Sequence, residues 1–296
     1  MLPLCLLLLP VAAQPDEGLA KKMLPIYQKE VADYTIAVES DPSKPLELKK
    51  EPVFEWSNPG RDGLAVQGVV FLWLRDGRPA VVCSIFSEPR NEWKGRTLLH
   101  EFHALDREKL VVTRPKDALN QWKPEVGLAR QELADAPPPA ETPAARLLQM
   151  KKLAAEFTGH GLDTAEKRVD MRLLPTPLYR YPVAKNGVID GAIFAFVATT
   201  GTDPEILLLI EAREEKGKAR WEFACGRFSD KSLSVRRKDK EVWSLARGET
   251  NTWLHDPRHT FRVYPDKIVT PEGKLIARLK ATEQVWWGEF FPAEDK

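Results

Sequence analysis

An internal repeat constrains the fold of this chain more than any other feature. Residues 68–73 (GVVFLW) match residues 191–196 (GAIFAF), and a turn and a second apolar segment follow in both copies. Further along, residues 110–114 (LVVTR) match residues 233–237 (LSVRR). Similar segments that recur in the same order at this spacing indicate a structural unit that occurs twice.

Each unit is predicted to be a helix followed by an antiparallel β-meander with short turns. The second helix is the clearer one: Thr142 is a capping residue, Pro143 suits the first helical position, and Gly159 is expected to stop the helix. The first helix is expected from about residue 16 to residue 34. Pro25 interrupts it, so a kink or a split is expected there.

The predicted fold class is therefore α+β, with two tandem repeats of a helix and an antiparallel β-meander, followed by C-terminal β-hairpins. A turn at residues 271–274 (PEGK) separates the strands of one such hairpin. The predicted segments are a signal peptide (1–13), the first unit (14–134), a Pro-rich linker (135–141), the second unit (142–250) and a β-hairpin extension (251–296).

Two of the predicted strands are apolar at consecutive positions, residues 69–74 and 206–210. Alternation of apolar and polar residues would indicate one solvated face, whereas continuous apolarity indicates that both faces are covered. The helix of each unit covers one face. The other unit, the C-terminal hairpins or a second chain are the candidates for the other face.

The N-terminal segment is predicted to be a secretory signal peptide. An apolar run of about a dozen residues, too short to span a bilayer, ends in the small residues Val11-Ala12-Ala13. It departs from the usual pattern because no Lys or Arg precedes the run. A buried N-terminal strand is the alternative. The predicted location of the mature chain, from Gln14, is the periplasm or the outside of the cell.

Four strings resemble an uncharacterised family of exported bacterial proteins. They are residues 142–150 (TPAARLLQM), 173–181 (LLPTPLYRY), 190–196 (DGAIFAF) and 207–213 (LLLIEAR). The resemblance covers most of the chain after the signal segment, except the C-terminal tail. It implies export and the internal repeat. Because that family has no assigned activity, the resemblance transfers no catalytic residue.

Charge and cysteine content exclude some classes of protein. Lys and Arg number 44 against 43 Asp and Glu, a net charge of +1, which gives no global field to attract nucleic acid. No segment after the N-terminal run is long and apolar enough for a transmembrane span. Cys83 and Cys225 are expected to be free thiols, because they fall in different strands of their units.

Glu101 and His103 are the candidate binding residues, together with Glu222, which matches Glu101 in the second unit. Alternate residues of a strand share a face, so a carboxylate would lie beside an imidazole, an arrangement suited to general-base chemistry. The simpler interpretation is a polar pair on a solvated face of the sheet. His100 would lie on the opposite face, at a packed aromatic position.

No catalytic residue, metal site or cofactor is predicted. His100 and His103 lack the spacing of a zinc protease, and Pro257 prevents a regular helix that would bring His255 and His259 together. Most of the tryptophans that recur in both units, among them Trp56, are interpreted as core anchors.

The leading functional hypothesis is a non-catalytic exported module that binds a protein, a glycan or a small apolar ligand. Two alternatives stay open. One is a hydrolase that uses Glu101 and His103, and the other is a structural envelope protein that forms a homodimer. A pocket lined by Glu101 and His103 would favour the hydrolase, whereas a filled core would argue against it.

Overall fold

The structure is a computed structural model that describes residues 17–61, 64–114, 122–163, 165–182, 187–199, 201–247, 256–280 and 289–293. The predicted signal segment 1–13 lies outside the described residues. Antiparallel sheets and two α-helices make up the described part of the chain, as the predicted α+β class requires. Neither of these helices is long and apolar enough to cross a membrane.

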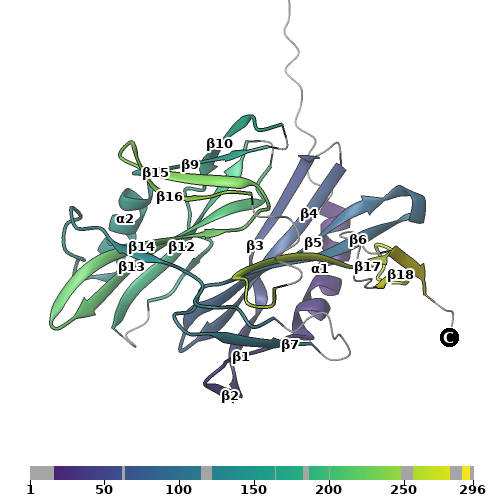
Figure 1. The fold of residues 1–296 in the computed structure, drawn as a ribbon, viewed down its shortest axis with the longest axis horizontal. Helices are drawn as coiled ribbons and strands as arrows, with labels where there is room; N and C mark the ends of the chain where they lie inside the picture. The colour runs from purple at the N-terminus through teal and green to yellow at the C-terminus, as the bar shows by residue number, and fades with distance from the viewer. Residues whose placement is uncertain are drawn as a thin grey trace, which may run out of the picture.

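The first sheet has seven strands, in the order β19-β18-β17-β6-β5-β4-β3 (Figure 1). Its strands are β3 (Glu47–Arg61), β4 (Leu64–Arg75), β5 (Arg78–Arg90), β6 (Gly95–Ala104), β17 (Phe261–Val269), β18 (Leu275–Lys280) and β19 (Glu289–Pro292). A 3-10 turn, η1 (Asn91–Trp93), joins β5 to β6. Helix α1 (Glu17–Ala32) packs on this sheet through Met23, Tyr27 and Val31.

The second sheet follows the order β16-β15-β9-β10-β12-β13-β14-β8, and β11 pairs with β12 beside this path. Its strands are β8 (Arg130–Glu132), β9 (Phe157–Leu162), β10 (Arg168–Leu173), β11 (Tyr179–Arg180), β12 (Val188–Ala198), β13 (Pro204–Glu215), β14 (Lys218–Arg227), β15 (Ser232–Arg237) and β16 (Lys240–Leu245). Helix α2 (Pro143–Ala154) packs on it through Met150, Leu153 and Ala154.

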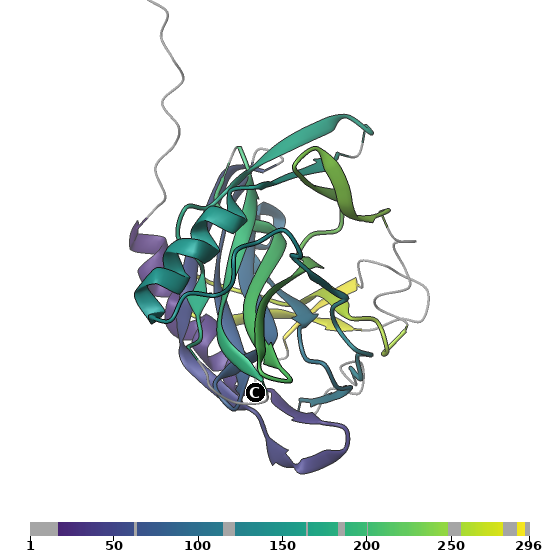
Figure 2. The same ribbon diagram turned by 90° about the vertical axis from the view of Figure 1, so that its left-hand side faces the viewer.

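A small third sheet, β2-β1-β7, lies below the first in Figure 1. It contains β1 (Thr35–Val38), β2 (Asp41–Pro45) and β7 (Leu110–Thr113). Figure 2 shows the β1–β2 hairpin at the bottom of the molecule and both helices along one edge.

Helix α2 begins as predicted, whereas its predicted end and the predicted split of α1 are wrong. The Thr142 side chain accepts a hydrogen bond from the Ala145 amide at 3.3 Å, and Pro143 is the first helical residue. The helix ends at Ala154, before the expected stop at Gly159, which lies in β9. Helix α1 is continuous through Pro25. Pro25 is exposed, so its ring lies on the solvated side of the helix.

Each sheet is covered on both faces, because the two sheets pack against each other. In β4, Val70 and Leu72 contribute to the core between the sheets, while Phe71 faces α1. In β12, Ile193 contributes to the same inter-sheet core, and Phe194 faces α2. The second cover of each of these strands is therefore the other large sheet.

The chain crosses between the sheets in two places. Strand β8, which follows the first meander, pairs with β14 of the second sheet. Strand β17 returns after the second meander to pair with β6 of the first sheet, and the predicted turn before β18 is present, with Gly273 at φ +85°. The predicted boundaries at residues 134 and 250 therefore do not coincide with the limits of the sheets. Cys83 and Cys225 are buried free thiols, as predicted.

Aromatic residues pack over glycines at the same level of the two meanders. Phe54 pairs with Val70, two residues after Gly68, and Tyr179 pairs with Ile193, two residues after Gly191. A Cβ atom on Gly68 would lie 2.8 Å from the Trp56 ring, and one on Gly191 would lie 2.3 Å from the Tyr181 ring. The recurrent tryptophans expected to be core anchors, Trp56, Trp73, Trp122 and Trp221, are buried, and Trp243 is half-buried.

Candidate functional site

Glu101 and His103 lie in β6, which has β5 on one side and β17 on the other. Glu101 is opposite Ser84 and Val263. Only 8% of Glu101 and 3% of His103 is exposed. The interpretation of a solvated polar face is therefore wrong. The reason is that the second sheet covers this face, which the pattern of a single strand does not reveal.

The surroundings of His103 are filled. Its Nδ1 donates to the Ala104 carbonyl oxygen at 2.7 Å. A Cβ atom on Gly226 of the second sheet would lie 3.4 Å from Nε2 of His103 and 3.2 Å from the Leu128 side chain. Burial lowers the pKa of His103 to about 4, so the imidazole is neutral at pH 7.

Glu222 does not join Glu101 and His103. It lies in β14, four residues before Gly226, or about 13 Å along the strand. Its carboxylate forms ion pairs with the side-chain nitrogens of three arginines, at 2.8 Å from Arg107, 3.4 Å from Arg220 and 3.6 Å from Arg213.

Glu101 and Glu222, which were predicted to be equivalent, do not occupy equivalent positions in the strand pairing of the two sheets. If Gly68 and Gly191 are taken as equivalent, the register places Glu101 level with Ala224. The sequence match is offset by two residues, which preserves the face of the sheet but changes the neighbours.

Near Glu222, a buried ion network joins the two sheets. Arg78 of β5 donates to Glu211 of β13 at 2.6 Å, and Arg130 of β8 lies 3.4 Å from the same carboxylate. The Tyr181 hydroxyl donates to Glu211 at 3.0 Å. Burial alone would raise the pKa of Glu211, but the two arginines outweigh it and lower the pKa to about 2. The charges of Glu211, Arg78 and Arg130 are therefore paired within the protein.

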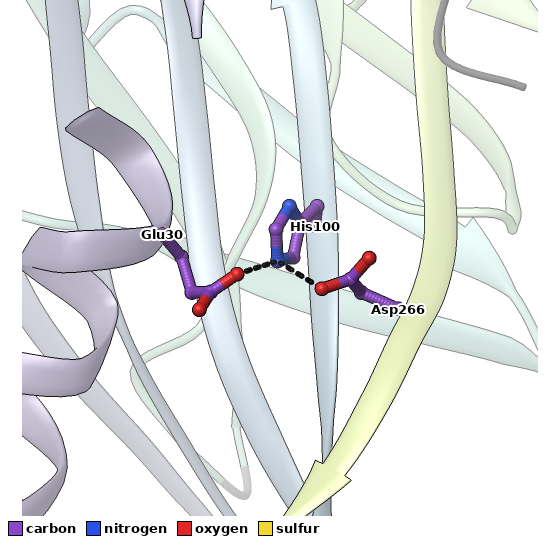
Figure 3. A group of neighbouring side chains, drawn as sticks. All are labelled: Glu30, His100 and Asp266. Atoms are coloured by element: carbon purple, nitrogen blue, oxygen red, sulfur yellow. Dashed lines mark ion pairs between the residues drawn. The ribbon is translucent and has the colours of Figure 1, made fainter. Parts of the chain in front are cut away.

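A second buried cluster lies on the opposite face of β6, around His100 (Figure 3). Glu30 comes from α1, His100 from β6 and Asp266 from β17. The Nε2 atom of His100 is 3.7 Å from Oε2 of Glu30 and 3.9 Å from Oδ2 of Asp266. One ligand atom of each of these residues lies within 4.8 Å of the others, so the three side chains could hold a metal ion.

Two tyrosines fix the other side of the imidazole. The Tyr34 hydroxyl oxygen is 2.5 Å from Nδ1 of His100 and also contacts the Tyr264 hydroxyl. The rings of His100 and Tyr264 pack with centroids 5.4 Å apart. The expectation that His100 occupies a packed aromatic position agrees with these contacts.

Two cations accompany the carboxylates. Arg114 donates to Glu30 at 2.6 Å and to Asp266 at 2.8 Å, and its guanidinium lies 5.0 Å from the Tyr34 ring centroid. Lys267 is 2.7 Å from Glu30 and 3.3 Å from Asp266. Burial lowers the pKa of His100 to about 3 and raises the pKa of Glu30. With a neutral imidazole, two carboxylates and two cations, the cluster has no net charge.

Sequence reasoning missed the carboxylates beside His100 because they come from distant elements. Glu30 and Asp266 are 70 and 166 residues away in the sequence. The register of β17 against β6 shifts between Pro265 and Lys267, so Asp266 is the extra residue of a β-bulge. The adjacent Asp266-Lys267 pair next to a proline was the available signal, but it does not reveal which strand it will pair with.

Comparison with known proteins gives no match. No protein-family model matches the chain, and no curated protein or solved structure is significantly similar to it.

Proposed function

We propose that this chain is an exported, non-catalytic interaction module built from two copies of a helix-and-meander unit. The observation that carries the proposal is the filled core around His103. The imidazole is buried and contacts the second sheet near Gly226, and its Nδ1 is bonded to a backbone carbonyl. General acid–base chemistry requires that the side chain reach a substrate atom. A His and a Glu enclosed between two sheets do not meet that requirement.

The duplication has support from packing. An aromatic residue covers a glycine in both meanders, Trp56 over Gly68 and Tyr181 over Gly191. In each unit the strand after the helix pairs with the strand after the meander, β1 with β7 and β9 with β15. Independent sequences have no physical reason to repeat these pairings in the same order. Export remains a proposal that rests on the N-terminal segment and on the family resemblance.

The hydrolase alternative is tested with substrates. Purified mature chain, beginning at Gln14, would be assayed against ester, peptide, phosphoester and glycoside substrates beside Glu101→Gln and His103→Gln variants. We expect no turnover that depends on either residue. Hydrolysis by the native chain that both variants lose would overturn the proposal and establish the hydrolase.

The homodimer alternative is tested by sedimentation of the same protein. The interaction module is expected to be a monomer across a wide concentration range. A concentration-dependent dimer would favour the structural envelope protein and contradict a module that binds a different partner.

A further inference from the structure

We propose that the chain binds a divalent transition-metal ion between Glu30, His100 and Asp266, in competition with the Lys267 ammonium. The ligands are Oε2 of Glu30, Nε2 of His100 and Oδ2 of Asp266. This inference goes beyond the proposed interaction module and does not depend on it, because it rests on a different face of the first sheet.

The distances between the ligand atoms favour an ion over direct hydrogen bonds. The separations of 3.7 Å and 3.9 Å from Nε2 to the two carboxylates exceed the usual hydrogen-bond length of about 2.7–3.2 Å. Ligands of a tetrahedral ion with bonds of about 2.0–2.2 Å are about 3.4 Å apart. A contraction of a few tenths of an ångström would therefore bring Nε2 to this separation from each carboxylate oxygen, and the two oxygens lie within 4.8 Å of each other.

Nε2 of His100 is the second observation that points to a ligand. His100 is fully buried, and Nε2 has no hydrogen-bond partner. The atom points between the two carboxylates in Figure 3. Tyr34 occupies Nδ1, at 2.5 Å, and so fixes the ring orientation. Metal-binding histidines are held in this way, with one nitrogen oriented by a hydrogen bond and the other left for the ion.

Lys267 explains why the carboxylates are stable without an ion. Its ammonium bridges both, and its side chain is 16% exposed, against 7% for Arg114. The Lys267 stem is flexible and can turn its charge toward solvent, whereas Arg114 pairs with both carboxylates and stacks on Tyr34. Lys267 pairs with Oε1 of Glu30 and lies 3.3 Å from Oδ2 of Asp266, whereas Arg114 lies 2.6 Å from Oε2 of Glu30. A carboxylate oxygen has two lone pairs, so an entering ion would displace Lys267 from Oδ2 of Asp266 and share Oε2 of Glu30 with Arg114.

One imidazole nitrogen with two carboxylate oxygens suits zinc and its neighbours in the first transition row. Calcium and magnesium select all-oxygen sites, so His100 argues against them. Zinc is the appropriate probe because it accepts nitrogen and oxygen ligands in a four-coordinate site, in which water supplies the remaining position.

The test measures zinc binding to the chelator-treated full chain by calorimetry and by metal analysis after dialysis. The native chain should retain one zinc, and His100→Phe should lose it. Phenylalanine is chosen because Phe223 occupies the position in the second sheet that is equivalent to His100 by strand pairing. His160→Gln, which removes a half-exposed histidine far from the cluster, is the matched control and should bind like the native chain.

Lys267→Met separates a metal site from a purely structural ion cluster. Removal of the competing charge should tighten zinc binding by about 10-fold or more, in the range that outer-shell changes produce. A structural cluster would gain no zinc from this change. X-ray absorption of the zinc-loaded chain should show one imidazole ligand, and this result decides the question if His100→Phe fails to fold.

Two outcomes would overturn the proposal. One is the absence of zinc binding in both the native chain and Lys267→Met. The other is a zinc stoichiometry that folded His100→Phe leaves unchanged, which would place the ion elsewhere.

Discussion

At the scale of single residues, the sequence predicted the faces of β6 better than their surroundings. Alternation along the strand placed Glu101 and His103 together and His100 on the other side, and the two buried cores agree with this. The solvation of the first face was mispredicted. Burial there depends on a sheet whose residues, such as Gly226, come more than a hundred positions later in the chain.

His103 provides a prediction about pH. Its pKa is about 4 in the folded chain and 6.5 ordinarily, because burial disfavours the charged imidazolium and Arg227 adds to the effect. Between these values the unfolded chain binds the proton and the folded chain does not. The contribution of His103 to stability is therefore complete above pH 6.5 and is lost as the pH falls toward 4, by about 3 kcal/mol at 1.36 kcal/mol for each pKa unit.

Urea unfolding of the native chain and of His103→Gln, measured from pH 7 to pH 4, tests this. The native free energy of unfolding should fall more steeply with decreasing pH than that of the variant. His100 titrates in both proteins, so the difference isolates His103. His160→Gln serves as the comparison: partial burial lowers the pKa of His160 as well, so this variant should lose some of the pH dependence, but less than His103→Gln. Parallel curves for His103→Gln and the native chain would refute the prediction.

At the scale of elements, local chemistry predicted where α2 begins but not where it ends. The cap at Thr142 and the position of Pro143 are properties of adjacent residues. Gly159 resembled a helix stop, but it is a strand residue that leaves room for Phe196, whose ring atoms would lie 3.0 Å from an added Cβ. A glycine that permits close packing of another element cannot be distinguished from a stop by its neighbours in the sequence.

The short strand β11 depends on such a glycine. Tyr181, just after β11, lies over Gly191 of β12 and donates to Glu211. We expect Gly191→Ala to displace the ring and to lower the free energy of unfolding by about 2–3 kcal/mol, as overpacking in cores does. Urea denaturation measures the loss. Gly226→Ala is the matched control, because its nearest contact is 3.2 Å, and it should cost less. Equal losses would contradict the crowding explanation.

At the scale of the whole molecule, the sequence pattern predicted antiparallel sheets and two helices but not how the chain joins them. Strand β8 belongs to the second sheet, and β17, β18 and β19 complete the first. These crossings bring together residues that are distant in the sequence, such as Arg78 with Glu211 and His100 with Asp266. Local pattern indicates that a segment is a strand, whereas its partner depends on the assembled core. The cluster around His100 was inaccessible to sequence reasoning for the same reason.

The shared core also determines how the chain folds. Burial of the second sheet's inner face depends on the first sheet, and it involves fully buried apolar side chains including Ile193, Val197, Leu207 and Leu209. A fragment of residues 130–247 keeps α2 and the second sheet but exposes that face to water. Exposed apolar area costs about 25 cal/mol for each Å², so we expect the fragment to self-associate and to unfold without a cooperative transition.

Co-expression of two pieces, residues 17–129 and 130–296, provides the complementary test. The second piece carries β17, which pairs with β6 of the first, as well as the inner face of the second sheet. The pieces should therefore assemble into a 1:1 complex with a single cooperative unfolding transition, measured by sedimentation and thermal denaturation. A monomeric 130–247 fragment that unfolds cooperatively would show instead that the second unit is an independent domain, as the predicted boundaries at residues 142 and 250 imply. The inter-sheet core favours the first result, because each sheet supplies one of its two walls.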